Sequence, residues 1–579
     1  MTQKVRVALL LGIALLVYAN ALGDGFTYDD EGYVLRSQAV QTASLAKLFQ
    51  PTQGNNIFRP FAFATFAVNW AVSGPQPFGY HLLNLLLHAG VTLLLYLVLQ
   101  TLLAPRPRGE IVAFVAALLF AVHPIHTEAV TSIVGRAELL AAGFLFAAWL
   151  LHLQDRPVAA LLCFALALLS KESAVVFLPL VLAGDYALGK FKPLARYAWI
   201  SGLTLLYIAL LWKVQGGHFE KGVYTPLDNP LANLTVTLRV LNALRVAWKY
   251  IGLQLYPATL SYDYSYNAIR LFADWRHTLP AAAATLVVLG LWFWTVWTKR
   301  GSWMLAGAIY LGGFAVTSNI LVSTGTIMGE RLAYLPSAGF CLLIALIWAQ
   351  LQPENPLGKR SSQLAWLLII CVVCALSLRT VLRNRDWRDN LTLYSTDVRV
   401  VPESVRAHLN LGDEYLRRRQ VQAAHDEFQI GLKIYPDSPG ALERYGLTES
   451  LMGQDREACG DLAKALALAQ KDDPNYDLMA WYLATVLTKV GREGEALAVL
   501  NREIAEARAS PRVWANRAEI RYRRGEIAGA RGDAETALRL DPGNATARGL
   551  LDEMGKKGKD EPQRGAGNTE GTQEKRVEK

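Results

Sequence analysis

Three consecutive acidic residues, Asp29, Asp30 and Glu31, follow the first apolar stretch of the chain. Their mutual repulsion must be offset by water, by a cation or by positively charged side chains from elsewhere in the fold. A carboxylate in such a cluster could take a proton from an acceptor hydroxyl, or it could bind a metal ion. An exposed loop would explain the same three residues equally well, so the other charged groups must decide between these interpretations.

Two further motifs lie close together between apolar stretches. His123, His126 and Glu128 fall within six residues, a set that could bind a divalent cation or, if protonated, position a phosphate. A hydrogen-bonded turn that caps the next helix is the alternative. Arg136 could face an anionic ligand, whereas Glu138, two residues further on, does not share its helix face and could pair elsewhere.

Two more cations, Lys171 and Arg331, stand at the ends of apolar stretches, and a third, Arg59, lies before Pro60 in the loop that carries the acidic triplet; Arg331 directly follows Glu330. Ionisable groups at membrane depth are costly, so each one is a functional candidate. Local salt bridges are the alternative to contacts with an anionic substrate.

The composition indicates that a membrane domain must position these residues. Of the 579 residues, 52% are hydrophobic and only 18% are charged, which is typical of a membrane protein. The formal charge of +9 lies largely in short loops and in the tail, so we expect no nucleic-acid partner. Eleven candidate spans are 5–22, 80–103, 110–126, 129–152, 157–171, 173–188, 195–213, 278–298, 302–321, 331–351 and 363–382.

Lysine and arginine in the short loops predict the orientation of these spans. The basic loops fall on one side, which is therefore cytoplasmic. The acidic triplet, the loops 24–79 and 214–277 and everything after residue 382 then lie outside. Arg379, Arg383, Arg385 and Arg388 violate this rule at the last crossing, and an even number of spans would place the soluble domain inside. Within the second loop, the amphipathic stretch 234–256 is predicted to be a helix on the membrane surface.

The C-terminal part shows an internal repeat with a period near 34 residues. This spacing of small residues is typical of tetratricopeptide repeats, in which two helices of a hairpin cross closely. We expect the concave face to bind an extended peptide; a spacer or an oligomerisation surface without a dedicated ligand is the alternative. The equivalent small residues are Gly412, Gly446, Ala484 and Ala518 in one helix and Ala424, Ala458, Ala496 and Ala530 in the other.

These patterns predict an all-α protein in four parts. Residues 1–388 form the membrane domain, 389–404 a linker, 405–542 four tetratricopeptide repeats and 555–579 a disordered charged tail. Acids and separated cations on one outer surface suit transfer from a phosphate-linked donor. A carboxylate would take the acceptor proton, and cations or a divalent metal, Mg²⁺ or Mn²⁺, would stabilise the departing phosphate.

Two other function classes fit parts of the sequence. A non-catalytic, membrane-anchored repeat scaffold for protein assembly or secretion would need none of the outer polar motifs. A transporter would place its polar groups at mid-membrane depth rather than on one surface.

The ordered series of motifs resembles the transmembrane and tetratricopeptide-repeat O-mannosyltransferases and their bacterial relatives. The motifs are Tyr28-Asp29-Asp30, Phe58-Arg59-Pro60, Tyr80-His81 with Asn84 and His88, His123-Pro-Ile-His126-Thr-Glu128, Gly135-Arg136-Ala-Glu138, Ser170-Lys171-Glu172, Glu330-Arg331-Leu-Ala-Tyr334 and Arg383-Asn384-Arg-Asp386-Trp387. The resemblance implies a GT-C glycosyltransferase fold with about eleven spans. It implies transfer of mannose or another hexose from a polyprenyl-phosphate donor to a hydroxyl group. The expected acceptor is the hydroxyl of a protein Ser or Thr.

The resemblance also assigns roles to residues. The base maps to Asp29 or Asp30, with Asp30 preferred, and donor phosphate contacts map to Arg136, Lys171, Arg331 and Arg59. His123, His126, Glu128 and Glu330 are expected to support the site or to hold a metal. A bacterial-type member would lie in the inner membrane, with its repeats in the periplasm and a protein or peptide acceptor bound through them.

Overall fold

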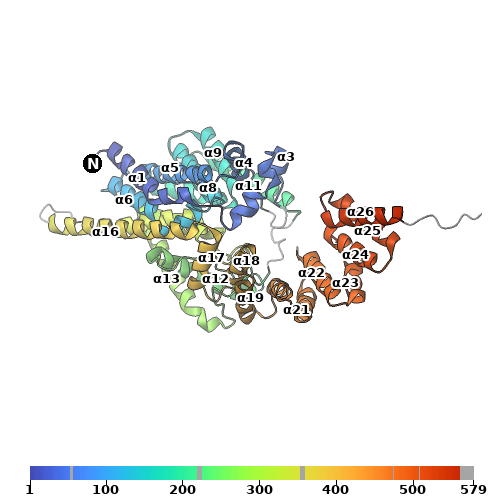
Figure 1. Cartoon of the computed structure of the whole chain (residues 1–579). Helices are drawn as coiled ribbons and strands as arrows, with labels where there is room; N and C mark the ends of the chain where they lie inside the picture. The colour runs from blue at the N-terminus through green and yellow to red at the C-terminus, as the bar shows by residue number, and fades with distance from the viewer. Residues whose placement is uncertain are drawn as a thin grey trace, which may run out of the picture. The chain divides into compact units, whose positions relative to one another are not determined.

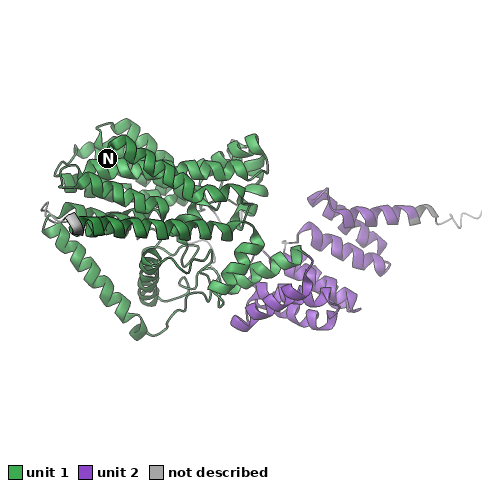
Figure 2. Cartoon of the chain, turned by 60° about the vertical axis from the view of Figure 1, so that its left-hand side comes forward, with its two compact units in different colours: residues 1–418 green, residues 419–579 purple. Residues whose placement is uncertain are grey.

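The structure, a computed structural model, describes residues 1–52, 57–217, 225–352, 359–471, 473, 475–506 and 509–560. Every regular element within these residues is a helix (Figure 1), which confirms the all-α prediction. The chain splits into two compact units, residues 1–418 and 419–579 (Figure 2). Helix α26 (Ala545–Asp560) covers the start of the predicted tail, and residues 561–579 lie outside the described part.

Seven helical segments of unit 1 are long and apolar enough to cross a membrane, counted over the described residues. They are α1 (Gln3–Tyr18) with the turn to Gly23, α5 (Phe78–Leu103), α8 (Arg136–Leu153), α11 (Leu194–Val214), α13 (Leu279–Trp297), α15 (Tyr334–Gln350) with its preceding turn, and α16 (Lys359–Asn384) with the following turn.

The other predicted spans are shorter or bent. Helix α6 (Gly109–Val122) and the segment Pro124–Val130 meet at 53° and would make an eighth span if counted together. The chain bends there because His123 is extended and Pro124 starts a new turn. The remaining three are α9 (Pro157–Ser170), α10 (Phe177–Leu188) and α14 (Gly301–Ala315).

Helices α5, α6, α8 and α15 form the centre of unit 1 and share one hydrophobic core. Glycines allow the close crossing of α14 and α15: a Cβ on Gly339 would lie 2.5 Å from the Ala306 carbonyl oxygen. Helix α13 differs, because none of its residues is buried. Its residues are half-buried or exposed, and it contacts the rest of unit 1 mainly through α12 and α14.

The loops after α1 and α11 and the segment after α16 pack together at one end of unit 1. They contribute α2 (Gln38–Gln41), α3 (Leu45–Leu48), α4 (Pro60–Ser73), α12 (Val236–Leu255), α17 (Asn390–Val400) and α18 (Val405–Arg417). The predicted surface helix 234–256 corresponds to α12, which buries Asn242, Val246 and Tyr250 against the protein.

Residues 389–404, which the sequence predicts to be a linker, are mostly helical. Helix α17 occupies most of this segment and buries Leu393, Tyr394 and Asp397. Helix α18, predicted as the start of the repeats, belongs to unit 1, because the boundary between the units falls after Arg418.

Unit 2 holds the remaining repeat helices, which contact each other in consecutive pairs. Gly446 and Ala458 lie at the crossing of one pair, where a Cβ on Gly446 would meet Leu462 Cγ at 2.9 Å. The helices are α19 (Val421–Ile434), α20 (Pro439–Leu451), α21 (Asp455–Leu468), α22 (Tyr476–Lys489), α23 (Glu493–Ala505), α24 (Pro511–Arg523), α25 (Ile527–Leu540) and α26.

Candidate active site

The two neighbouring aspartates of the acidic triplet have different surroundings. The Asp30 side chain is fully buried. Its carboxylate accepts hydrogen bonds from the backbone N–H groups of Thr27, Ile133 and Val134, at 3.1, 3.4 and 2.9 Å. Asp29 is only partly buried, and among the described residues no hydrogen-bond donor or ion-pair partner contacts its carboxylate.

Local backbone geometry separates the two side chains. Tyr28 has a φ of +51°, in the left-handed region that a residue with a Cβ rarely adopts. The Tyr28 N–H is held by Asn390 Oδ1 at 2.9 Å, and Asn390 Nδ2 donates to Glu31 Oε1 at 2.6 Å. Asn390 of α17 therefore supports the loop on both sides of the aspartates.

Cations from three separate parts of unit 1 act on Asp29. Burial raises the pKa of the Asp29 carboxyl, whereas the charges of Arg331, Arg406 and Arg59 act to lower it. A carboxylate that accepts no hydrogen bond and has a raised pKa is suited to take a proton from a hydroxyl. The preference for Asp30 over Asp29 as the base is therefore not supported by the geometry, because the oxygens of Asp30 are occupied by the backbone.

Three of the predicted phosphate-binding cations form ion pairs with acids from neighbouring motifs. The pairs are Arg59 with Glu172, Lys171 with Glu138, and Arg331 with Glu128. The charges of each pair act on those of at least one other pair. Together they form a cluster of ion pairs in which Arg331, with a side chain 30% exposed, is the most accessible cation.

Each of these cations is placed by a break in a helix. Arg59 precedes Pro60, the first residue of α4, and Lys171 lies extended between α9 and the next turn. Arg331 lies in the short turn before α15, where its own N–H also donates to Glu128 Oε2 at 2.8 Å.

The acid partners keep this cluster charged. The Arg59 guanidinium donates twice to the Glu172 carboxylate, at 3.1 and 2.6 Å. Burial alone would raise the pKa of Glu172, but Arg59 and Lys171 outweigh it and lower the pKa to about 2. Glu172 therefore stays ionised across the physiological range.

Arg136 lies apart from this cluster and is fully buried. All of its hydrogen-bond partners are neutral, and its guanidinium also stacks 4.6 Å from the ring centre of Phe66. Arg136 thus joins α4, α5 and α8. Because its guanidinium N–H groups are already bonded to these helices, Arg136 is poorly placed to bind the phosphate of a sugar donor, contrary to the prediction. The hydrogen-bond acceptors are Asn84 Oδ1, Asn69 Oδ1, Thr65 Oγ1 and the backbone oxygens of Thr65 and Tyr80.

The predicted metal set does not converge on a common point. His123 uses both ring nitrogens, with Gln254 O at 2.9 Å and the Ile125 N–H at 3.2 Å, and Glu128 is engaged by Arg331. His126 Nε2 bonds Ser337 Oγ at 2.7 Å. Within the part of the chain that the structure describes, no group of three or more His, Cys, Asp or Glu residues is arranged to hold a metal ion.

Glu330 belongs to a different buried network. Its Oε1 accepts from the Ser261 N–H and the Tyr264 hydroxyl, at 2.6 and 2.7 Å. These bonds tie the turn before α15 to the loop segment 257–266. Glu330 is therefore a link between two loop segments rather than a metal ligand with His123 and His126.

Sequence reasoning missed Arg406 and Asn390 as parts of the site. Both lie beyond the last span, in segments that the sequence assigns to the repeats or to a linker. The Arg383–Trp387 motif just before them was the available signal, because it extends the family-like pattern past residue 382.

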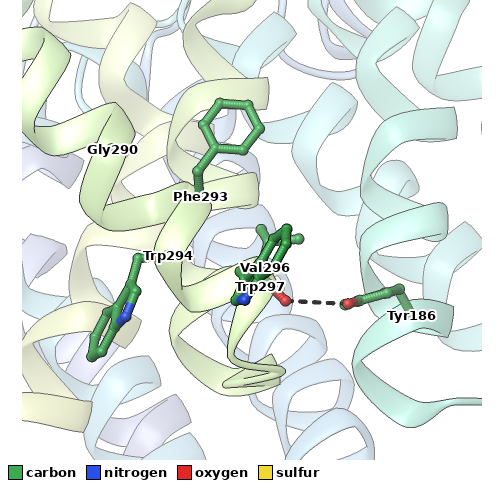
Figure 3. Close-up of a pocket in the computed structure, with 6 residues that line it drawn as sticks. All are labelled: Tyr186, Gly290, Phe293, Trp294, Val296 and Trp297. Atoms are coloured by element: carbon green, nitrogen blue, oxygen red, sulfur yellow. Dashed lines mark hydrogen bonds between the residues drawn. The ribbon is translucent and has the colours of Figure 1, made fainter.

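An apolar recess of about 570 Å³ opens on another part of unit 1 (Figure 3). The Tyr186 hydroxyl donates to the Val296 carbonyl oxygen there, at 3.2 Å. The recess is otherwise lined by Gly290 and by aromatic side chains of α13, and no carboxylate lines it. It is suited to hydrocarbon rather than to a reacting sugar.

The chain is similar in sequence to one group of known proteins. A family model described as "Protein O-mannosyl-transferase TMTC, DUF1736" matches residues 218–288. The protein O-mannosyl-transferase F38B6.6 of Caenorhabditis elegans is 29% identical over 452 residues, which cover 75% of this chain and 64% of that protein. The protein O-mannosyl-transferase TMTC3 of Mus musculus is 30% identical over 512 residues, covering 80% of this chain and 55% of that protein.

The chain spans between about half and two thirds of the length of these curated relatives. Among solved structures, the tetratricopeptide-repeat protein YrrB matches 32% of this chain and 91% of its own, at 14% identity and a TM-score of 0.25. The sequence matches extend over most of this chain and include the outer loop that contributes α12. The chain is therefore a relative of the TMTC protein O-mannosyl-transferases.

Proposed function

We propose that the chain is an integral-membrane glycosyltransferase that moves mannose, or another hexose, from a polyprenyl-phosphate donor to a Ser or Thr hydroxyl of a protein. The observation that carries the proposal is the carboxylate of Asp29, which accepts no hydrogen bond from the described residues and lies in the field of Arg331, Arg59 and Arg406. A free carboxylate beside cations is what an acceptor hydroxyl and an anionic leaving group together require.

In the proposed reaction, the Asp29 carboxylate removes the proton of the acceptor hydroxyl. The oxygen attacks the anomeric carbon from the face opposite the phosphate, so that the configuration inverts. The bond between that carbon and the phosphate oxygen breaks, and its electron pair stays on the polyprenyl phosphate. Arg331 is the best placed cation to stabilise this phosphate, because part of its side chain remains accessible.

The contacts of α18 support placement of the acids and the first repeat helix on the same side of the membrane. Arg417 of α18 donates to Glu31 Oε1 at 2.9 Å. If the acidic triplet lies on the non-cytoplasmic side, as the basic loops indicate, the repeats follow on that side. In a bacterium this would be the periplasmic face of the inner membrane.

A lipid-linked donor suits the membrane setting of unit 1, because its apolar helices could contact an isoprenoid chain. The proposal does not depend on this contact, because the reacting groups lie elsewhere in unit 1.

The test is transfer of radiolabelled mannose from synthetic polyprenyl-phosphate mannose to a Ser/Thr-rich peptide by the purified full chain. Wild type should transfer, and Asp29→Asn should lose transfer while retaining its melting temperature in detergent. Full transfer by Asp29→Asn would overturn the assignment of the base. Absence of transfer by wild type with every lipid-linked hexose tried would instead favour a non-catalytic, membrane-anchored scaffold.

A further inference from the structure

Helix α18 contacts the outer end of unit 1 through one face, although the sequence places it in the repeat array. Arg406, Asn410 and Arg417 are spaced by four and seven residues and so share that face. Arg406 pairs with Asp228, Asn410 Nδ2 donates to the Tyr262 hydroxyl at 2.9 Å, and Arg417 reaches Glu31. One helix face therefore contacts the acidic triplet and the outer loop together.

Apolar packing continues the same contact. Leu411 and Tyr415 of α18 belong to a cluster with Tyr28 and Tyr262, whose ring centres are 4.8 Å apart. Tyr28 directly precedes Asp29. The position of α18 is thus coupled through packed side chains to the backbone that presents Asp29.

The entry into α18 is fixed as well. The Val405 N–H donates to the Tyr266 carbonyl oxygen at 2.8 Å, and Ser404 Oγ donates to Asp263 Oδ2 at 2.6 Å. These bonds set where the helix begins, and with it the position of Arg406 one residue further on.

We propose that Arg406 is a positioning residue for sugar transfer, which holds Asp228 of the outer loop and keeps its positive charge close to the loop that presents Asp29. This inference rests on the proposed function, because Arg406 affects sugar transfer only if Asp29 is the base. It would make the first repeat helix a part of the transfer site, so that the repeats carry a residue of the site as well as an acceptor-binding surface.

The groups that face Asp29 determine the sign of the expected effect. Arg331, Arg406 and Arg59 favour its charged form, and the neighbouring carboxyl of Asp30 opposes it. Removal of the Arg406 charge should raise the pKa of Asp29. The base would then become active only at higher pH.

The test compares pH profiles of transfer by the full chain. With Arg406→Gln, the acidic limb should move to higher pH, so that the rate on that limb falls about 3- to 10-fold and recovers at high pH. Arg406→Lys keeps the charge and should stay close to wild type. Arg399→Gln is the matched control, because Arg399 is exposed on α17 and its side chain bonds only Ser395 and Thr396 of its own helix.

The partner acid separates an electrostatic role from a simple tether. Asp228→Asn weakens the same ion pair but leaves the Arg406 charge, so the acidic limb should stay in place or move to lower pH. An equal loss of rate at every pH in Arg406→Gln and Asp228→Asn would overturn the proposal, as would a wild-type profile for Arg406→Gln.

A second measurement keeps this inference distinct from the proposed function. Water-soluble carbodiimide modifies protonated carboxyls, so the pH dependence of Asp29 labelling, followed by peptide mass spectrometry, reports its titration without any donor. The labelling midpoint should rise in Arg406→Gln and stay unchanged in Arg399→Gln. If wild type transfers no sugar but this midpoint moves, the proposed function fails while the effect of the Arg406 charge on Asp29 stands. An unmoved midpoint overturns that effect.

Discussion

The carboxylates of Asp29 and Asp30 are adjacent in sequence and opposite in environment. Asp30 accepts three backbone hydrogen bonds, two of them from the turn before α8, while Asp29 accepts none from the described residues. A buried carboxylate with this many backbone donors is a structural element of the loop. Its unbonded neighbour, Asp29, is the carboxylate that we propose as the base.

The first prediction separates these two roles by the same substitution. Asp29→Asn should reduce transfer by about 10²–10⁴-fold with little change in melting temperature, because it removes a base but no bond. Asp30→Asn should destabilise the protein by about 1–3 kcal/mol, because an amide NH₂ would face backbone N–H groups. Transfer assays and thermal unfolding in detergent check both; an unstable Asp29→Asn with normal turnover per folded molecule would reverse the assignment.

The second prediction concerns the buried ion pair of Lys171 and Glu138. Both side chains are almost fully buried, so Lys171→Met leaves an unpaired carboxyl and should cost about 3–5 kcal/mol of stability. The double variant Lys171→Met/Glu138→Met should recover most of this loss in thermal unfolding. The exposed pair Arg523–Glu519 of α24 provides the control: Arg523→Met should change stability by less than about 1 kcal/mol. A double variant no more stable than the single one would show that the residues act separately.

The third prediction concerns pH and Asp24. Burial raises the pKa of Asp24 from 3.8 to about 7. Since the folded state binds this proton more tightly, the contribution of Asp24 to stability is greatest below about pH 4 and is lost as the pH rises through 7. The melting temperature of Asp24→Asn relative to wild type should therefore be higher at pH 8 than at pH 4. Asp552→Asn, at an exposed position of α26, should show no such trend. The opposite trend for Asp24→Asn would contradict the burial of its charge.

The fourth prediction tests the helix crossing in unit 2. A Cβ at Gly446 would lie 2.9 Å from Leu462 Cγ, whereas nothing lies within 4 Å of a Cβ at Gly460. Gly446→Val should destabilise the repeats by about 1–3 kcal/mol through overpacking, while Gly460→Ala should be neutral or stabilise by up to about 1 kcal/mol. Limited proteolysis of the full chain should show faster cleavage within 419–560 for Gly446→Val alone. Equal cleavage of the two variants would argue against a tight crossing at Gly446.

The sequence predicted the elements that depend on local pattern. Long apolar stretches and the spacing of Gly446 and Ala458 are periodic signals, and the corresponding helices are present. The pairing of charges is not a local signal. Glu138 pairs with Lys171 from the next helix boundary, and Arg136, two residues before it, is bonded to neutral groups of α4 and α5.

The absence of a local signal for distant contacts also explains why the sequence favoured Asp30 rather than Asp29 as the base. Nothing in the sequence of the triplet shows that the turn at 132–134 directs its N–H groups at Asp30, because that contact spans about a hundred residues. The role of α18 was hidden for a different reason. Its small residue at Gly412 fits the repeat pattern, while the contacts that place it in unit 1 involve Asp228 and Tyr262 from a distant loop.

The boundary after Arg418 has a consequence for how such a chain can change over evolution. Stability in a repeat array is approximately a sum of terms between neighbouring units. Duplication or loss of modules beyond Arg418 would leave the bonds of Arg406, Asn410 and Arg417 unchanged. Array length is therefore free to diverge among descendants, whereas the helix that opens the array is constrained to co-evolve with the acidic loop.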